Sequence, residues 1–124
     1  MESGKLKTEN VLRKKSYAFA IRSVKLYKFL ADEHREYVLS KQALRSGTSI
    51  GANIAEGSQA QSKSDFIHKL SISLKEAFET QYWLELLRDC EYLKPDHAES
   101  MLTDCSELQR ILTASIKTAK RSLK

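Results

Sequence analysis

The segment from residue 42 to residue 57, QALRSGTSIGANIAEG, places three of the chain's four glycines inside a pattern that otherwise predicts a helix. A glycine in a helix interior costs about 1 kcal/mol relative to alanine, so some other interaction must offset Gly47 and Gly51. Both glycines fall on the same side of the helix as Ala43 and Ile54, where missing side chains let a neighbouring backbone approach. The pattern therefore predicts close packing against a second helix.

The opposite side of this segment is polar but carries fewer lysines and glutamates than a solvated helix face usually does. Its side chains can donate or accept hydrogen bonds, and such groups demand partners when they are buried. We expect them to form a hydrogen-bond network, in packing or between subunits, rather than a catalytic site. The network is assigned to Gln42, Arg45, Ser49, Asn53 and Glu56.

Helical patterns continue on both sides of this segment. Thr8 or Asn10 is expected to cap a first helix that ends near residue 32. A second helix is expected from about residue 37 to residue 58. The turn between them is assigned to residues 31–36.

Two further helices are expected in the second half of the chain. Ser62 and Asp65 have the spacing of a capping box, at the start of a helix that ends near residue 91. Pro95 suits the first turn of a last helix, which ends near residue 120. Because the connections are short, we predict an all-α, antiparallel up-down-up-down four-helix bundle that forms a single domain over residues 1–124.

The apolar positions predict which faces form the core. The residues expected to be buried are Leu12, Phe19, Ala20, Val24, Leu26, Tyr27 and Leu30 in the first helix, Phe66, Ile67, Leu70, Leu74, Ala77, Phe78, Leu84 and Leu87 in the third, and Met101, Leu102, Cys105, Leu108, Leu112 and Ile116 in the fourth.

Positive charge is concentrated in the first half of the chain. Residues 1–62 hold eleven Lys or Arg against six Asp or Glu, whereas residues 63–124 hold ten of each. Such a concentration attracts polyanions, so we predict nucleic-acid binding through the first helix, with recognition of shape or backbone. The alternative is a solvated face whose aliphatic stems cover nearby apolar residues. The predicted binding residues are Lys14, Lys15, Arg22, Lys25 and Lys28.

Apolar residues remain on the first and third helices after the core is assigned. Large apolar residues rimmed by charge mark contact surfaces, so self-association is expected. The basic face of the first helix is predicted to dock on an acidic stripe of the third helix from another subunit, which can close a ring. The alternative is that both faces pack within one subunit. The predicted interface residues are Ile21, Phe29, Ile72, Trp83 and Leu86.

Sequence signatures of catalysis, metal binding and export are absent. Asp65 and His68 form only half of a carboxylate-x-x-His motif, and no second pair accompanies them. No nucleophile motif or phosphate-binding glycine loop is present. We therefore expect no enzyme activity, no cofactor and no metal. The chain lacks an apolar export segment or membrane span, so a cytoplasmic protein is expected.

Three segments resemble the bacterial four-helix-bundle family encoded in 23S rRNA intervening sequences, often labelled 23S ribosomal protein. They are LSKQALRSGTSIGANIAEG from residue 39, SKSDFIHKLSISLKEAFETQYWLELL from residue 62 and ELQRILTASIKT from residue 107. The resemblance implies a homopentameric ring, similar to accessory proteins of diversity-generating retroelements that work with a reverse transcriptase and nucleic acid. It implies no enzyme. The expected partners are further copies of the chain and either RNA or a nucleic-acid-processing protein, and the open alternative is an oligomeric protein-protein scaffold that binds no nucleic acid.

Overall fold

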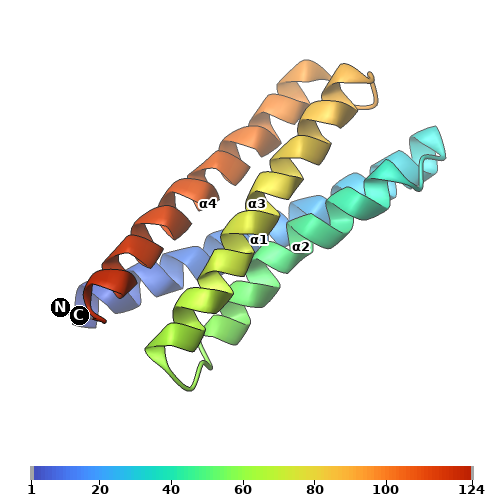
Figure 1. Ribbon diagram of the computed structural model, residues 1–124. Helices are drawn as coiled ribbons and strands as arrows, with labels where there is room; N and C mark the ends of the chain where they lie inside the picture. The colour runs from blue at the N-terminus through green and yellow to red at the C-terminus, as the bar shows by residue number, and fades with distance from the viewer. Residues whose placement is uncertain (1, 124) are drawn as a thin grey trace.

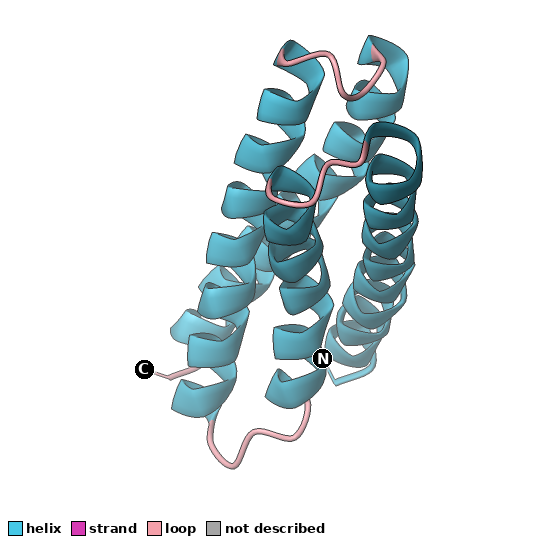
Figure 2. Ribbon diagram, turned by 90° about the vertical axis from the view of Figure 1, so that its right-hand side faces the viewer, coloured by secondary structure: helices cyan, strands magenta, loops and turns pink. Residues whose placement is uncertain are grey.

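Four α-helices form an antiparallel bundle in the computed structural model, which describes residues 2–123. They are α1 (Glu2–His34), α2 (Leu39–Gly57), α3 (Lys63–Asp89) and α4 (Pro95–Arg121). Each helix packs on the next one in sequence, and α4 also packs on α1 (Figure 1). Short loops at the ends of the bundle join the helices (Figure 2). The predicted fold class is confirmed.

The helix starts confirm two of the expected capping signals. Ser62 Oγ accepts a hydrogen bond from Asp65 N at 3.1 Å at the start of α3, and Pro95 is the first residue of α4. The expected start of α1 was wrong, because Thr8 and Asn10 lie inside a helix that begins at Glu2. The six residues before Thr8 contain no proline, so the helix continues through them without the cap.

Glu36 caps α2, although the sequence analysis assigned it only to the turn. Its carboxylate accepts backbone N–H bonds from Val38 and Leu39, both at 3.1 Å, and from Ser40 at 2.8 Å. Partial burial alone would raise the pKa of Glu36, but these N–H donors and the Ser40 hydroxyl outweigh it and leave the pKa below its ordinary value. The ionised carboxylate therefore stabilises the start of α2.

The core runs along the inner faces of all four helices and contains most of the residues expected there. Two expectations were wrong. Phe78 is 54% exposed and Val24 is 38% exposed, because each lies at the edge of its helix's apolar arc and no neighbouring helix covers that edge. The buried side chains from α1 are Leu12, Phe19, Leu26 and Leu30, and the largest from α3 and α4 include Leu70, Leu84, Leu87, Met101, Leu108 and Leu112.

The predicted close packing at the glycines is confirmed. A Cβ added at Gly47 would lie 2.9 Å from Ser23 Cβ and nearer still to Ser23 Oγ, which is closer than real Cβ atoms approach. A Cβ added at Gly51 would lie 3.3 Å from the backbone oxygen of Ser16. Two buried serines of α1 thus meet two glycines of α2. The missing side chains allow these two helices to pack closely.

The two cysteines lie in different environments. Cys105 is buried and its Sγ donates to the carbonyl oxygen of Ala77 at 3.2 Å. Burial raises the pKa of the Cys105 thiol to about 12, so the thiol stays protonated. Cys90 is exposed at the end of α3.

Candidate nucleic-acid interface

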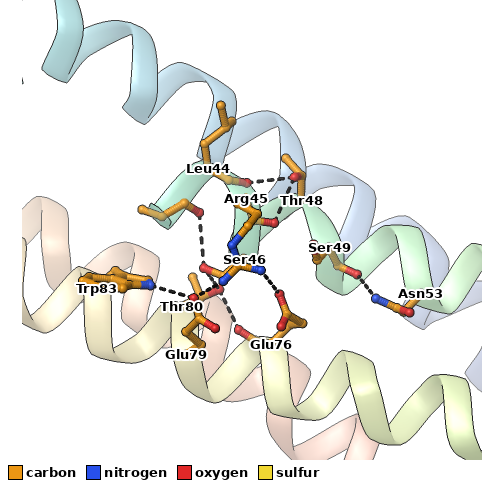
Figure 3. Close-up of polar contacts among 11 residues, drawn as sticks. Leu44, Arg45, Ser46, Thr48, Ser49, Asn53, Glu76, Glu79, Thr80 and Trp83 are labelled. Carbon is orange, nitrogen blue, oxygen red and sulfur yellow. Dashed lines mark hydrogen bonds and ion pairs between the residues drawn. The ribbon is translucent and has the colours of Figure 1, made fainter. Parts of the chain in front are cut away.

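Arg45 joins the polar side of α2 to α3. Its guanidinium pairs with Glu76, at 2.9 Å, and with Glu79 (Figure 3). Trp83 Nε1 also donates to Glu79 Oε2 at 2.9 Å, so one carboxylate binds two donors. This part of the predicted network therefore exists as a contact between two helices of one subunit.

The electrostatics of this contact favour its ionised form. The hydrogen bond from Trp83 lowers the pKa of Glu79 most, and Arg45 lowers it further against the opposing effect of burial. In turn, the hydrogen bond to Glu79 raises the pKa of Arg45. About half of the Arg45 side chain is exposed, so solvent screens the pair.

The other predicted network residues do not join Arg45. Asn53 Nδ2 donates to the backbone oxygen of Ser49 at 2.9 Å, within α2 (Figure 3). Glu56 pairs with Lys69 of α3 at 3.0 Å. Gln42 is exposed. Four of the five residues therefore form separate local contacts along one side of α2, and the Gln42 side chain joins none of these contacts.

Buried hydroxyl groups supply contacts that the predicted network omitted. Thr80 Oγ1 lies 2.9 Å from Ser46 Oγ and 2.8 Å from the carbonyl oxygen of Glu76. Ser73 Oγ donates to the carbonyl oxygen of Ile50 at 2.8 Å. Ser73 and Thr80 are seven residues apart among the core positions of α3, a spacing that could have identified them from the sequence. They connect α2 and α3 inside the bundle.

The acidic and apolar stripe predicted on the third helix lies beside α2. Ile72, Trp83 and Leu86 are half-buried, and Trp83 packs against the core. The acidic groups Glu76 and Glu79 already pair with Arg45. Two of the three acidic groups predicted to receive another subunit, Glu76 and Glu79, are thus paired within this chain, and the third, Asp65, is exposed. This weakens the predicted docking geometry and leaves self-association a prediction.

Two of the five predicted nucleic-acid-binding cations are paired with α4. Lys15 contacts Glu107 at 2.9 Å, and Arg22 contacts Asp104 at 2.6 Å. Arg22 also donates to Ser100 Oγ at 3.0 Å. These two side chains bridge α1 and α4, so their charge is partly neutralised.

The other three predicted cations, Lys14, Lys25 and Lys28, are exposed on α1. Within the described part of the chain they make no ion pair. Ile21, which is 43% exposed, lies on the same outward side of the helix. Tyr17 and Val24 lie nearby and are exposed too. The outer side of α1 is therefore a strip of lysines and apolar side chains.

Phe29, the remaining predicted interface residue, lies near the end of α1 and is 40% exposed. Its ring meets His34 edge to face, with the ring centroids 5.4 Å apart. His34 in turn meets Tyr92, which follows α3, at 5.5 Å. The structure thus joins Phe29 to an aromatic cluster that the sequence analysis did not predict.

Among residues 7–123, whose side chains the structure describes, no three His, Cys, Asp or Glu side chains gather in a way that could hold a metal ion. The described helices also include none with the length and apolar character needed to cross a membrane.

Comparisons with known proteins agree with the sequence resemblance. Residues 8–114 match the family model described as 23S rRNA-intervening sequence protein. The chain resembles a protein of unknown function from the S23 ribosomal protein family of Bacteroides thetaiotaomicron VPI-5482, whose crystal structure is known. The two sequences are 56% identical, and the two structures superpose with a TM-score of 0.88. The match covers 89% of this chain and 98% of that one. No curated protein matches the chain.

Proposed function

Because the chain belongs to the 23S rRNA-intervening sequence protein family, we propose that it is a cytoplasmic, non-catalytic and homo-oligomeric bundle that binds nucleic acid. The proposed ligand is structured RNA, and the proposed contact surface is the outer side of α1. The proposed assembly is the pentamer implied by the family resemblance. The family match supports the fold, whereas the proposed binding rests on the chain's own surface.

The observation that carries the proposal is the exposed lysine set Lys14, Lys25 and Lys28. Lysines without a protein partner are free to neutralise phosphates and release the counterions condensed on a polyanion. Lys15 and Arg22 contribute less, because α4 carboxylates already pair with them. An oligomer would multiply the exposed set and thus the number of phosphates contacted.

The test is RNA binding measured across a range of salt concentrations. The logarithm of the association constant falls with the logarithm of salt, with a slope of about one unit per phosphate contact. Replacing Lys14, Lys25 and Lys28 by Ala is expected to reduce the slope by about three units per subunit that contacts the RNA. The matched control replaces the exposed Lys75, Lys117 and Lys120 by Ala, which removes the same charge from α3 and α4.

The proposal fails if the protein does not bind RNA at low salt, or if the control triple variant reduces the slope as much as the α1 variant. Either result would show that no specific surface on α1 is involved.

An oligomeric protein scaffold without nucleic-acid binding is the second candidate function. The exposed Tyr17, Ile21 and Val24 favour it, since large apolar side chains beside charges mark protein contact surfaces. Ile21→Ser would then change the oligomeric mass, as measured by light scattering, whereas the lysine variant would leave the mass unchanged.

A further inference from the structure

A groove of about 520 Å³ opens where α1 ends and α3 turns into α4. At this end of the bundle the α1–α2 pair and the α3–α4 pair diverge (Figure 1). The volume is within the range of about 300 to 1,000 Å³ that is typical of small-molecule sites. None of the three lysines of the strip on the outer side of α1 lines this groove.

Aromatic rings line one part of this groove. Phe29, His34 and Tyr92 form the cluster described above, in which both ring pairs are edge to face with interplanar angles of 72° and 83°. The 40% exposure of Phe29 leaves ring surface available to a ligand. Aromatic faces of this kind stack on the flat rings of nucleobases.

The backbone after α3 holds the second wall of the groove in place. Glu91 has a φ of 67°, and the N–H of Tyr92 donates to the carbonyl oxygen of Leu87 at 2.9 Å, which is the bond that closes a Schellman motif. Leu93 is buried in the core beside it. Tyr92 is therefore fixed to the body of the bundle.

Basic side chains line the groove beside the aromatic cluster. Lys94 and His97 line the groove, and within the described residues neither makes an ion pair. Arg88 lines it too, but Asp89 and Glu99 already pair with this side chain. Glu91 is the acidic residue of the lining. The cation available to an anionic ligand is thus Lys94, and the His97 side chain lies beside it in the lining. Both residues are at the N-terminus of α4, where the Asp96 carboxylate already accepts the N–H of His97 at 3.0 Å.

We propose that this groove binds a nucleotide. The base stacks on the ring of Phe29 and the adjoining cluster, and the phosphate contacts Lys94 and His97. An uncharged aliphatic ligand would not use Lys94, and inorganic phosphate would not use the rings. The nucleotide is either free or the unpaired end of an RNA strand, and the second source rests on the function proposed above. Lys25 and Lys28 lie within about one turn of Phe29 on α1, where they can contact the next phosphates.

Saturation-transfer difference NMR with AMP, CMP, GMP and UMP tests the proposal on the full chain, with inorganic phosphate as competitor. Base protons are expected to receive more saturation than ribose protons, and phosphate is expected to compete only weakly. Phe29→Leu is expected to weaken nucleotide binding about five- to hundredfold, the range found when one stacking contact is removed. The matched control is Phe78→Leu, which alters an exposed aromatic ring on α3 and should leave binding unchanged.

A second arm compares a mononucleotide with a 5′-phosphorylated single-stranded tetranucleotide. Tighter binding of the tetranucleotide supports the proposal and identifies the end of an RNA strand as the ligand. Equal or weaker binding of the tetranucleotide supports the proposal and identifies a free nucleotide as the ligand. The proposal is overturned if no mononucleotide binds at millimolar concentration, or if Phe29→Leu and Phe78→Leu have the same effect. The proposal is also overturned if Phe29→Leu both abolishes nucleotide binding and changes the oligomeric mass, because Phe29 is then a contact between subunits.

The outcome is separable from the function proposed above. If a blunt RNA duplex binds in a way that depends on Lys14 and Lys25 but no mononucleotide binds, only the nucleotide-binding proposal for the groove is overturned. If mononucleotides bind but the duplex does not, only the proposed RNA binding by the α1 lysines is overturned.

Discussion

The two sides of α2 are held by different kinds of contact. Toward α1 the helix presents Gly47 and Gly51, against which Ser16 and Ser23 pack closely. Toward α3 it presents Arg45 and several hydroxyl and carbonyl groups that bind partners across the interface. The close packing toward α1 requires that the two glycines have no side chains. The contact with α3 requires specific hydrogen-bond donors and acceptors.

This difference teaches where the bundle tolerates change. A shortened side chain on the α3 side loses one contact that water can partly replace where the group is exposed. An added methyl group on the α1 side has no space, so two helices must move apart. We therefore expect substitutions at the two glycines to reduce the stability of the bundle more than substitutions on the α3 side of the helix.

The largest effect is expected for Gly47→Ala. Overpacking typically costs about 1 to 3 kcal/mol, and the better helix propensity of alanine returns only about 1 kcal/mol. Since the new Cβ meets Ser23 Cβ itself, we expect a net loss of up to about 2 kcal/mol in unfolding free energy, measured by chemical denaturation. Adding Ser23→Gly should recover part of it.

Gly51→Ala is the control for that prediction. Its Cβ would lie 3.3 Å from Ser16, so helix propensity and crowding should nearly cancel. Equal losses at Gly47 and Gly51 would contradict the idea that the approach to Ser23 limits the packing.

A smaller effect is expected at Glu36, which caps the start of α2 and so serves both sides of the helix. Glu36→Gln removes the charge from the cap and should reduce the unfolding free energy by about 1 kcal/mol near neutral pH. Because the pKa of Glu36 is lowered by folding, its contribution is complete above the ordinary value of 4.5 and is lost as the pH falls through the folded-state value.

The measurement is the difference in unfolding free energy between wild type and Glu36→Gln, at about pH 7 and about pH 3. The difference should shrink at the lower pH. A difference that stays constant or grows would show that ionised Glu36 does not stabilise the cap.

The smallest effect is expected for Arg45→Gln, on the α3 side. The pair with Glu76 and Glu79 is half exposed at the guanidinium, and such pairs contribute about 1 kcal/mol or less. High salt should reduce the difference between wild type and variant in thermal unfolding. If Arg45→Gln reduced the unfolding free energy more than Gly47→Ala does, the α3 side of α2 would be the more sensitive one, contrary to this comparison.

Local chemistry explains which parts of the fold were predictable. The Ser62 cap and Pro95 each act within a few residues, so the sequence alone indicated them correctly. The glycine spacing indicated a close approach of another helix, but it could not identify Ser16 and Ser23, which lie on a different helix. Glu36 was missed because it caps from outside the usual N-cap position, which Val38 occupies.

The surface residues were harder to assign, because exposure depends on which neighbour covers a helix edge. Phe78 and Trp83 both lie beside the apolar arc of α3, yet only the flank with Trp83 is covered by α2. The same limit applies to the basic residues: sequence identified Lys14 and Arg22 alike, and only the position of α4 distinguishes the exposed lysine from the paired arginine.

The contrast between the two thiols has a practical consequence. A maleimide or nitroxide reagent reacts with thiolate, so the protonated and inaccessible Cys105 is protected while the exposed Cys90 is open to modification. Cys90 precedes Glu91 and Tyr92, so the native chain accepts a single spectroscopic label next to its aromatic groove without engineered cysteines.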